Sequence, residues 1–163
     1  MIEKRRVFIQ KLAGLSLASM VGCKPLVAAS APVKRTGKPI ILSTWDNKPA
    51  NNRAWEILST GGRALDAVEQ GVMITEADPN DTSVGYGGFP DRDGNVTLDA
   101  CIMDEKGRCG AVAYLQHIMH PIRVARLVMD KTPHWMLVGD GALAFALAEG
   151  MKKENLLTPK AEA

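Results

Sequence analysis

The chain has 163 residues, 20 of them Lys or Arg and 18 Asp or Glu, so its formal net charge at pH 7 is +2. Residues 1–31 hold five of the basic residues and one acidic residue, so residues 32–163 have a formal charge of −2. This larger part has no basic stripe, which excludes the usual electrostatic footprint for nucleic acid, and we expect no nucleic-acid partner. Its length suits one domain, since domains commonly have about 100–200 residues.

Residues 1–31 have the pattern of a twin-arginine export leader. Arg5 and Arg6 precede an apolar stretch at 12–21 that is too short to span a membrane. The small residues VAASA suit cleavage by a peptidase near Ala31, whereas the sequence MVGC would alternatively allow lipidation of Cys23. We therefore expect export to the periplasm, with either a released or a lipid-anchored product, and a domain that covers residues 32–163.

The first elements after the leader are expected to be a strand and two helices. Residues 38–45, KPIILSTW, predict a buried strand because they form a short apolar run with β-branched residues. Residues 50–59 predict a helix that ends at two glycines and whose core face holds Ala54, Trp55 and Leu58. A second helix is expected over about 63–78, with an apolar face made by Leu65, Val68, Val72 and Thr75.

The rest of the chain predicts a hairpin, two helices and a further strand. Strands are expected at 95–103 and 109–115, joined by a turn at DEKG. A helix follows from Pro121, a favourable first-turn residue, and then a short strand at 136–138 and a helix at 142–149. This order of elements predicts an α+β fold with a partly antiparallel sheet.

The sequence near the C-terminus also predicts which single residues cap helices and which lie in the core. Asp140 is expected to cap the last helix, and Gly150 is expected to end it. Trp135 precedes a strand and is expected in the core. The sequence after Gly150 ends in NLLTPKAEA, which is expected to be a polar tail.

The segment 77–104 is dense in aspartate and glycine, which would suit a cation loop, a self-cleaving Asp81–Thr82 bond, a phosphate cradle or a structural bend. Asp91 and Asp93 have the opening spacing of a calcium loop, but no later acidic ligand completes it. The glycines at 85, 87 and 88 lack the Lys-Ser/Thr ending of a phosphate loop. We therefore expect a tight bend, with the aspartates as turn formers.

Cysteine and histidine do not predict a metal centre. Cys101 and Cys109 flank the expected hairpin turn, and they would share a face only across a loop of three or five residues. We expect no disulfide between them. His117 and His120 are three residues apart without a third ligand, so these and His134 are expected to be solvated or hydrogen-bonded. We expect neither a metal nor another cofactor.

Several stretches between Lys38 and Leu157 together resemble one protein family. They are PIILSTW, GGRALDAVEQGV, SVGYGGFPDRDGNVTLDACIMD, GAVAYLQHIMHPIRVARLVMDKTPHWMLVGDGALAFA and GMKKENLL. They are similar to the first half of bacterial glycosylasparaginases, which are N-terminal nucleophile hydrolases. The sequence GGRALDAV also resembles gamma-glutamyltransferases and plant-type asparaginases, whereas SVGYGGFPDRDGNVTLDA points to the glycosylasparaginase branch.

The resemblance implies the N-terminal half of a four-layer αββα sandwich, made as one precursor that cuts itself before a threonine. That threonine starts the β chain, with its hydroxyl as nucleophile and its α-amino group as base. The implied partners are the β chain, a small asparagine derivative as substrate, and a second αβ pair in an (αβ)2 heterotetramer. The family's Asp-Thr cleavage site is not present here, so no catalytic residue is expected in this chain. Asp81–Thr82 is no substitute, because it precedes SVGYGG and cleavage there would separate elements of one core.

The resemblance assigns one residue of this chain to the substrate site. Trp45, in STW, matches the tryptophan that packs beside the nucleophile and the substrate. The following loop, DNKPANN, departs from the family pattern, which leaves recognition of the distal sugar open. Two other functions also stay open: a plant-type asparaginase or isoaspartyl peptidase, and a non-catalytic exported domain.

Overall fold

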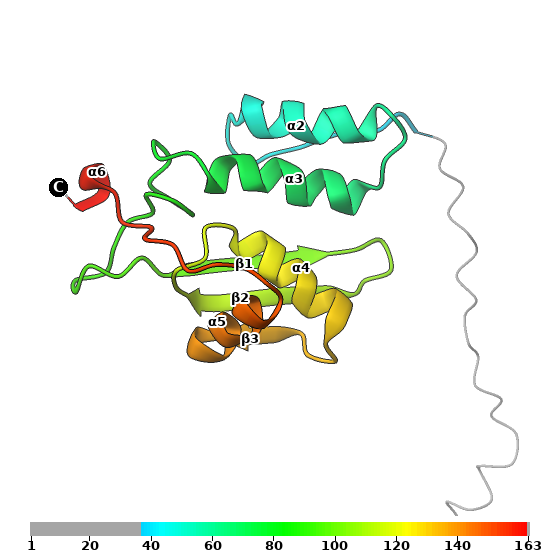
Figure 1. The fold of residues 1–163 in the computed structure, drawn as a ribbon. Coiled ribbons are helices and arrows are strands. Elements are labelled where there is room, and N and C mark those ends of the chain that lie inside the picture. Colours follow the sequence, from blue (N-terminus) through cyan, green and yellow to red (C-terminus); the bar gives the residue numbers. More distant parts are fainter. Residues whose placement is uncertain (1–36, 163) are drawn as a thin grey trace, which may run out of the picture. The chain divides into compact units, whose positions relative to one another are not determined.

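The computed structural model describes residues 37–162 (Figure 1). The expected leader, including Cys23, lies outside the described residues. The elements in chain order are α2 (Lys48–Leu58), α3 (Ala64–Glu76), β1 (Leu98–Met103), β2 (Cys109–Leu115), α4 (Pro121–Lys131), β3 (Met136–Val138), α5 (Gly139–Ala148) and α6 (Pro159–Glu162). This confirms the α+β class. Among residues 37–162, every helix is too short or too polar to cross a bilayer.

The sheet has the strand order β1-β2-β3, with β1 and β2 antiparallel and β2 and β3 parallel. The hairpin turn holds the three residues 105–107: the amide of Asp104 donates to the carbonyl of Arg108 at 2.9 Å. Gly107 takes a left-handed conformation with φ of 76°, which a glycine adopts without steric cost. The predicted hairpin is therefore confirmed.

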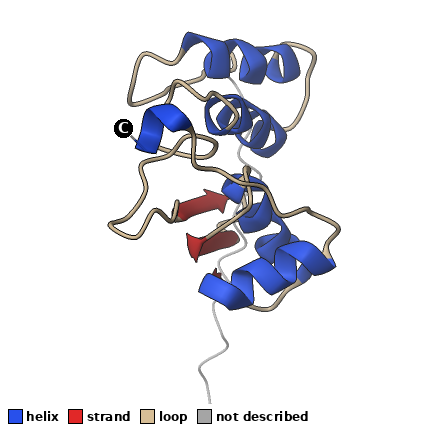
Figure 2. Ribbon diagram, turned by 60° about the vertical axis from the view of Figure 1, so that its left-hand side comes forward, coloured by secondary structure: helices blue, strands red, loops and turns tan. Residues whose placement is uncertain are grey.

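The main core lies between one face of the sheet and the helices α4 and α5 (Figure 2). Its fully or nearly buried members include Ile102, Val112, Leu115, Val124, Ala125, Val128, Ala142 and Ala146. Gly110 lies directly under α4, because a Cβ there would be only 2.1 Å from the carbonyl oxygen of Ala125. Helix α4 can approach β2 closely only because residue 110 has no side chain.

Helices α2 and α3 lie side by side at the β1 edge of the sheet (Figures 1 and 2). They pack through small residues: a Cβ on Gly71 would be 2.9 Å from the carbonyl oxygen of Ala50. The apolar face predicted for α3 is therefore partly wrong, because Val68 and Val72 are exposed. The buried face instead holds Leu65, Ala67, Glu69, Gly71 and Glu76.

Two of the three tryptophans were assigned to the wrong environment. Trp55 was expected in the core but is 47% exposed on α2, because the contact with α3 runs through Ala54 and leaves the indole outside. Trp135 was also expected in the core but is 76% exposed. It precedes β3, an edge strand of three residues, and the space beneath that strand is taken by Leu137 and the alanines of α5.

The strand predicted at 38–45 is absent from the described residues. No ladder of the sheet includes this segment, and Ile40 and Leu42 are 74% and 90% exposed. An extended segment needs a neighbouring strand to satisfy its backbone hydrogen bonds, and the described residues offer none at this position.

The C-terminal residues are not a polar tail as predicted. Leu156 packs with Val96 and Leu98 in a second apolar cluster, and Thr158 and Ala161 are also buried. The predicted cap at Asp140 is likewise wrong, because α5 begins at Gly139 and no side chain caps it. Gly150 does end α5, with φ of 88° and its amide bonded to the carbonyl of Leu147 at 3.0 Å.

Candidate functional site

Trp45 is held by its backbone while its side chain remains open to solvent. The carbonyl of Trp45 accepts hydrogen bonds from the amide of Asn47 at 2.9 Å and the hydroxyl of Ser43 at 2.7 Å. Asn51 donates to the same Ser43 hydroxyl at 3.0 Å. The indole is 81% exposed, so it forms no part of the core of the described residues. Its assignment to a substrate site stays a prediction.

Asn47 fixes the position of the segment that carries Trp45. Its side-chain oxygen accepts from the amide of Ala50 at 3.2 Å and so caps α2. Its side-chain nitrogen donates to the hydroxyl of Thr75, near the end of α3. The residues after Trp45 are therefore tied to the end of α3.

The end of α3 is organised around the buried carboxylate of Glu76, which no motif in the sequence marks. One oxygen accepts from the amide of Ile122 at 3.0 Å, and the other lies 3.2 Å from Nδ1 of His120. The carbonyl of Glu76 accepts from the amide of Tyr86 at 2.7 Å. Burial raises the pKa of Glu76, and the hydrogen bonds from His120 and Ile122 oppose that shift. This residue joins α3, the glycine-rich segment and α4.

The glycine-rich segment is a tight bend, as predicted. Gly85 and Gly87 have φ of 62° and 93°, and a Cβ on Gly85 would lie 2.0 Å from the carbonyl oxygen of Glu76. The amide of Gly87 donates to the carbonyl of Leu156 at 2.8 Å, which attaches the bend to the C-terminal segment. A larger residue at position 85 could not make this approach.

The aspartates near the bend form turns, as predicted. A side-chain oxygen of Asp91 accepts from the amides of Asp93 and Asn95 at 2.9 and 2.8 Å. These hydrogen bonds lower the pKa of Asp91, and Asn95 contributes the largest effect. Within residues 37–162, no three Cys, His, Asp or Glu side chains are grouped as metal ligands.

A network of ion pairs holds α3, the hairpin and α4 together. Asp104 has a buried side chain that binds Arg63 at 3.4 Å and Arg108 at 2.8 Å. Burial acts to raise the pKa of Asp104, but hydrogen bonds from Arg108 and Lys106 hold it below its ordinary value. Arg126 of α4 contacts Asp66 and Glu69 of α3 and Asp130 of its own helix. No periodicity or motif in the sequence indicated these pairs.

One face of the sheet is apolar and uncovered among the described residues. Side chains that alternate with the buried positions point to this open face: the charged Asp99 at its end, and Cys101, Met103, Cys109, Ala111, Ala113, Met136 and Val138. Met103, Met136 and Val138 are each more than half exposed. A face of this composition is normally buried against another layer.

The two hairpin cysteines share this open face and are free thiols. Cys101 lies opposite Ala111 and Cys109 lies opposite Met103, so the two are diagonal neighbours. Diagonal neighbours lie about 7–8 Å apart, beyond the usual Cα separation of a disulfide, about 4.4–6.8 Å. The three-residue loop therefore places them on one face without pairing them.

The three histidines lie in three different environments. His120 is hydrogen-bonded to Glu76, in agreement with the expectation for the histidines. His117 and His134 are exposed and lie on different connections, one after β2 and one before β3. They form no common site with Trp45 in the described part of the chain.

A protein family and known relatives that match this chain point to the same kind of protein. A sequence model described as "Asparaginase" matches residues 27–162. An N(4)-(Beta-N-acetylglucosaminyl)-L-asparaginase from Elizabethkingia miricola is 59% identical over 167 residues, which cover 99% of this chain and 48% of that protein. The mouse protein of the same name, from Mus musculus, is 44% identical over 145 residues, covering 88% of this chain and 40% of the relative. The chain thus spans about half the length, or less, of these relatives.

Proposed function

Because the chain belongs to the asparaginase family of amidohydrolases, we propose that it is the N-terminal portion of a glycosylasparaginase-like enzyme. The proposed reaction is cleavage of the side-chain amide of a glycosylated asparagine. The names of the relatives with 59% and 44% identity support this substrate class. The proposed partner is the remaining portion of the same precursor, in an assembly of two αβ pairs.

In the proposed mechanism, the nucleophile is a threonine outside this chain, at the start of the partner portion. Its hydroxyl attacks the amide carbon and displaces the amine, which leaves a β-aspartyl ester that water then hydrolyses. The free α-amino group of that threonine serves as base, since such groups have a pKa of about 7.7–8.0. The proposed contribution of this chain is a wall of the site at Trp45, supported by the fixed backbone around Asn47 and the anchored end of α3.

The open face of the sheet is the observation that carries this proposal. Helices α4 and α5 cover the opposite face, so the described residues contain one α layer and one β layer. A second sheet from the partner portion would cover Cys101, Met103 and Met136 and would complete a four-layer αββα sandwich. The exposed segment 38–45 would then gain the neighbouring strand that it lacks here.

We expect Cys101 to become protected when the chain pairs with a partner portion. The variant Cys23→Ser/Cys109→Ser leaves Cys101 as the remaining thiol, since the chain has three cysteines. Its reaction rate with a soluble thiol reagent is measured alone and after mixing with the part of the Elizabethkingia miricola relative that this chain does not cover. Burial beneath a second sheet should slow the reaction at least about tenfold, because reagent then needs a local opening.

The matched control places a cysteine at the exposed hairpin turn, as Lys106→Cys in a Cys23→Ser/Cys101→Ser/Cys109→Ser background. Its rate should not change on mixing, because the turn projects from the end of the hairpin rather than from its face. Amidase activity restored by mixing, with no protection of Cys101, would show that the partner binds elsewhere. The absence of both amidase activity and Cys101 protection after mixing would count against the proposed function itself.

We further propose that the protein is exported with residues 1–31 as its leader. The pair Arg5–Arg6 before a mild apolar stretch supports this proposal. Replacing both arginines with lysine should retain a folded reporter fusion in the cytoplasm, as measured by cell fractionation, whereas lysine substitutions outside the pair, such as Arg35→Lys, should not. Unchanged export of the Arg5→Lys/Arg6→Lys fusion would contradict the proposal.

A further inference from the structure

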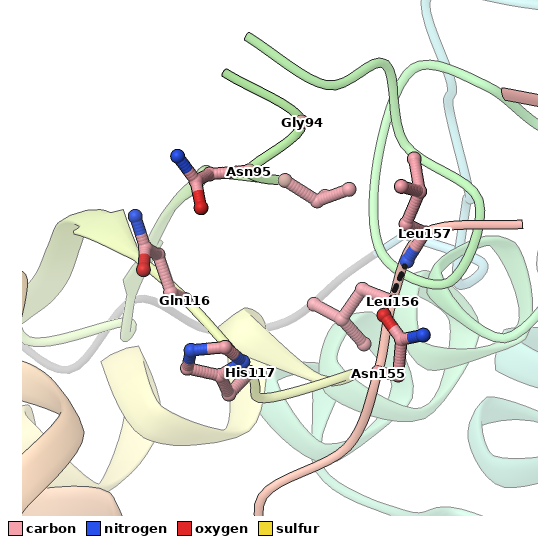
Figure 3. A pocket seen from close by; sticks show the side chains of 8 residues that line it. Gly94, Asn95, Gln116, His117, Asn155, Leu156 and Leu157 are labelled. Atoms are coloured by element: carbon pink, nitrogen blue, oxygen red, sulfur yellow. Dashed lines mark hydrogen bonds between the residues drawn. The ribbon is translucent and has the colours of Figure 1, made fainter. Parts of the chain in front are cut away.

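A cavity of about 200 Å³ lies where three connecting segments meet, away from Trp45. These segments are 94–96 before β1, 116–117 after β2, and 155–157 before α6 (Figure 3). The hairpin brings the first two together, since Leu98 is paired with Leu115. The third is held against them by the amide of Glu154, which donates to the carbonyl of His117 at 2.8 Å.

The cavity combines an apolar side with a polar rim that carries no charged side chain. Val96 and Leu156 are buried members of the second apolar cluster, and Leu157 packs beside them. The polar lining consists of the side chains of Asn95, Gln116, His117 and Asn155, which surround the cavity in Figure 3. An ionic ligand would find no counter-charge among these lining residues.

Several polar groups on the rim have unused hydrogen-bonding capacity within the described part of the chain. The side chain of Gln116 makes no hydrogen bond there, and neither does the ring of His117. Asn155 uses its side-chain oxygen for the amide of Leu157 at 3.2 Å, which leaves its two amide hydrogens for other acceptors. Asn95 donates to Asp91 at 3.3 Å, which leaves its side-chain oxygen for other donors. The rim therefore offers both donors and acceptors.

His117 occupies the rim at a conformational cost. Its φ is 64°, in the left-handed region that side-chain-bearing residues rarely adopt. The hydrogen bond from Glu154 to its carbonyl holds this conformation. Strained backbone of this kind is concentrated at ligand-binding sites, where it places a side chain that an unstrained residue would not present.

We propose that this cavity binds an uncharged, polyhydroxylated ring of the size of one monosaccharide. Amide and imidazole groups can donate and accept hydrogen bonds, as the hydroxyls of such a ring require. The leucine and valine side chains match its C–H face. The volume falls below the about 300–1,000 Å³ that is typical of drug-sized sites, which suits a single ring. The proposal does not depend on the amidase reaction, because it rests on residues outside the Trp45 region.

The test compares two probes that differ by one charge, D-glucose and D-glucuronate. Binding to the full 163-residue chain is measured by ligand-observed NMR and calorimetry, both for the chain alone and for the chain paired with the uncovered part of the Elizabethkingia miricola relative. Glucose is expected to bind with Kd on the order of 1 mM, a usual affinity for so small a ligand. Glucuronate should bind at least about tenfold more weakly, because its carboxylate finds no Lys or Arg among the lining residues.

Two variants separate binding from folding. His117→Gly removes the imidazole and also relieves the left-handed strain, so glucose affinity should fall at least about tenfold while the melting temperature stays equal or rises. Gln116→Leu should weaken glucose binding similarly, because it replaces the amide with an apolar group of similar size. Asn52→Leu removes an exposed amide on α2, away from the cavity, and should leave binding unchanged.

Opposite results would overturn the inference. Equal affinities for glucose and glucuronate would show that the rim does not select a neutral ligand, and no detectable binding to either form of the protein would show that the cavity is unused. Binding that is lost on pairing with the partner portion would assign the cavity to the interface between the two portions. Amidase activity is measured separately in the paired form, so loss of sugar binding with retained activity contradicts this inference alone.

Discussion

Trp45→Phe is expected to slow amide hydrolysis about a hundredfold in the enzyme formed by pairing this chain with a partner portion. Trp45 is 81% exposed, so the smaller ring should cost little folding stability. Its backbone is fixed through Ser43 and Asn47, so the loss would come from the missing contact with substrate and nucleophile rather than from a moved segment. The measurements are single-turnover hydrolysis of a glycosylated asparagine and the melting temperature of the paired protein.

Trp55→Phe is the matched control, because Trp55 is also substantially exposed but lies on α2 beyond the capping residue Asn47. It should change the free energy of unfolding by less than about 1 kcal/mol and leave the hydrolysis rate unchanged. If both substitutions leave hydrolysis per folded molecule unchanged, Trp45 lies outside the substrate site. If both substitutions slow hydrolysis equally, the two tryptophans act by stabilising α2 and the segment before it rather than by contacting substrate.

Gly110→Ala is expected to destabilise the protein by about 3 kcal/mol or more, the upper range for overpacking a core. The added Cβ would lie 2.1 Å from the carbonyl oxygen of Ala125 and 2.6 Å from the backbone nitrogen of Met129. Both atoms belong to the backbone of α4, so no flexible side chain can move aside, and α4 must shift away from β2. Chemical denaturation monitored by circular dichroism measures the loss.

Gly141→Ala provides the control for Gly110→Ala, because a Cβ there meets nothing within 4 Å and the backbone is not left-handed. Position 141 lies within α5, where alanine is favoured over glycine by roughly 0.5–1 kcal/mol. This variant should therefore be as stable as the parent or slightly more stable. Equal stability of both variants would show that the contact between α4 and β2 is looser than the structure indicates.

Most helices and strands after residue 47 could be predicted from the sequence with nearly correct ends, whereas the strand expected at 38–45 is absent. The hairpin strand Cys109–Leu115, the helix start at Pro121 and the strand Met136–Val138 all agree with the sequence patterns. Gly85 and Gly150 were assigned to a bend and a helix end, and both have positive φ. These features are decided by the allowed backbone conformations and hydrogen-bonding groups of a few neighbouring residues.

Burial could not be predicted in the same way. Trp55 and Trp135 were placed in the core because indoles are large and apolar, yet both are exposed. For α3, the helical period was correct but the buried face was not, since α2 approaches through Gly71 and leaves Val68 outside. Which apolar residues become buried depends on which element packs against them, and that choice is made between residues far apart in the sequence.

The sequence by itself determined the family, the α+β class, the order of the elements from α2 to α5 and the glycine-rich bend, because each of these follows from motifs or from interactions between near neighbours. Only the tertiary structure decided that Glu76 joins α3 to the bend and to α4. It also decided that one face of the sheet is left open and that His117, Gln116 and Asn155 surround a cavity. The physical reason is that long-range packing assembles these groups from distant segments. The local sequence of one segment does not indicate which other segment it will contact.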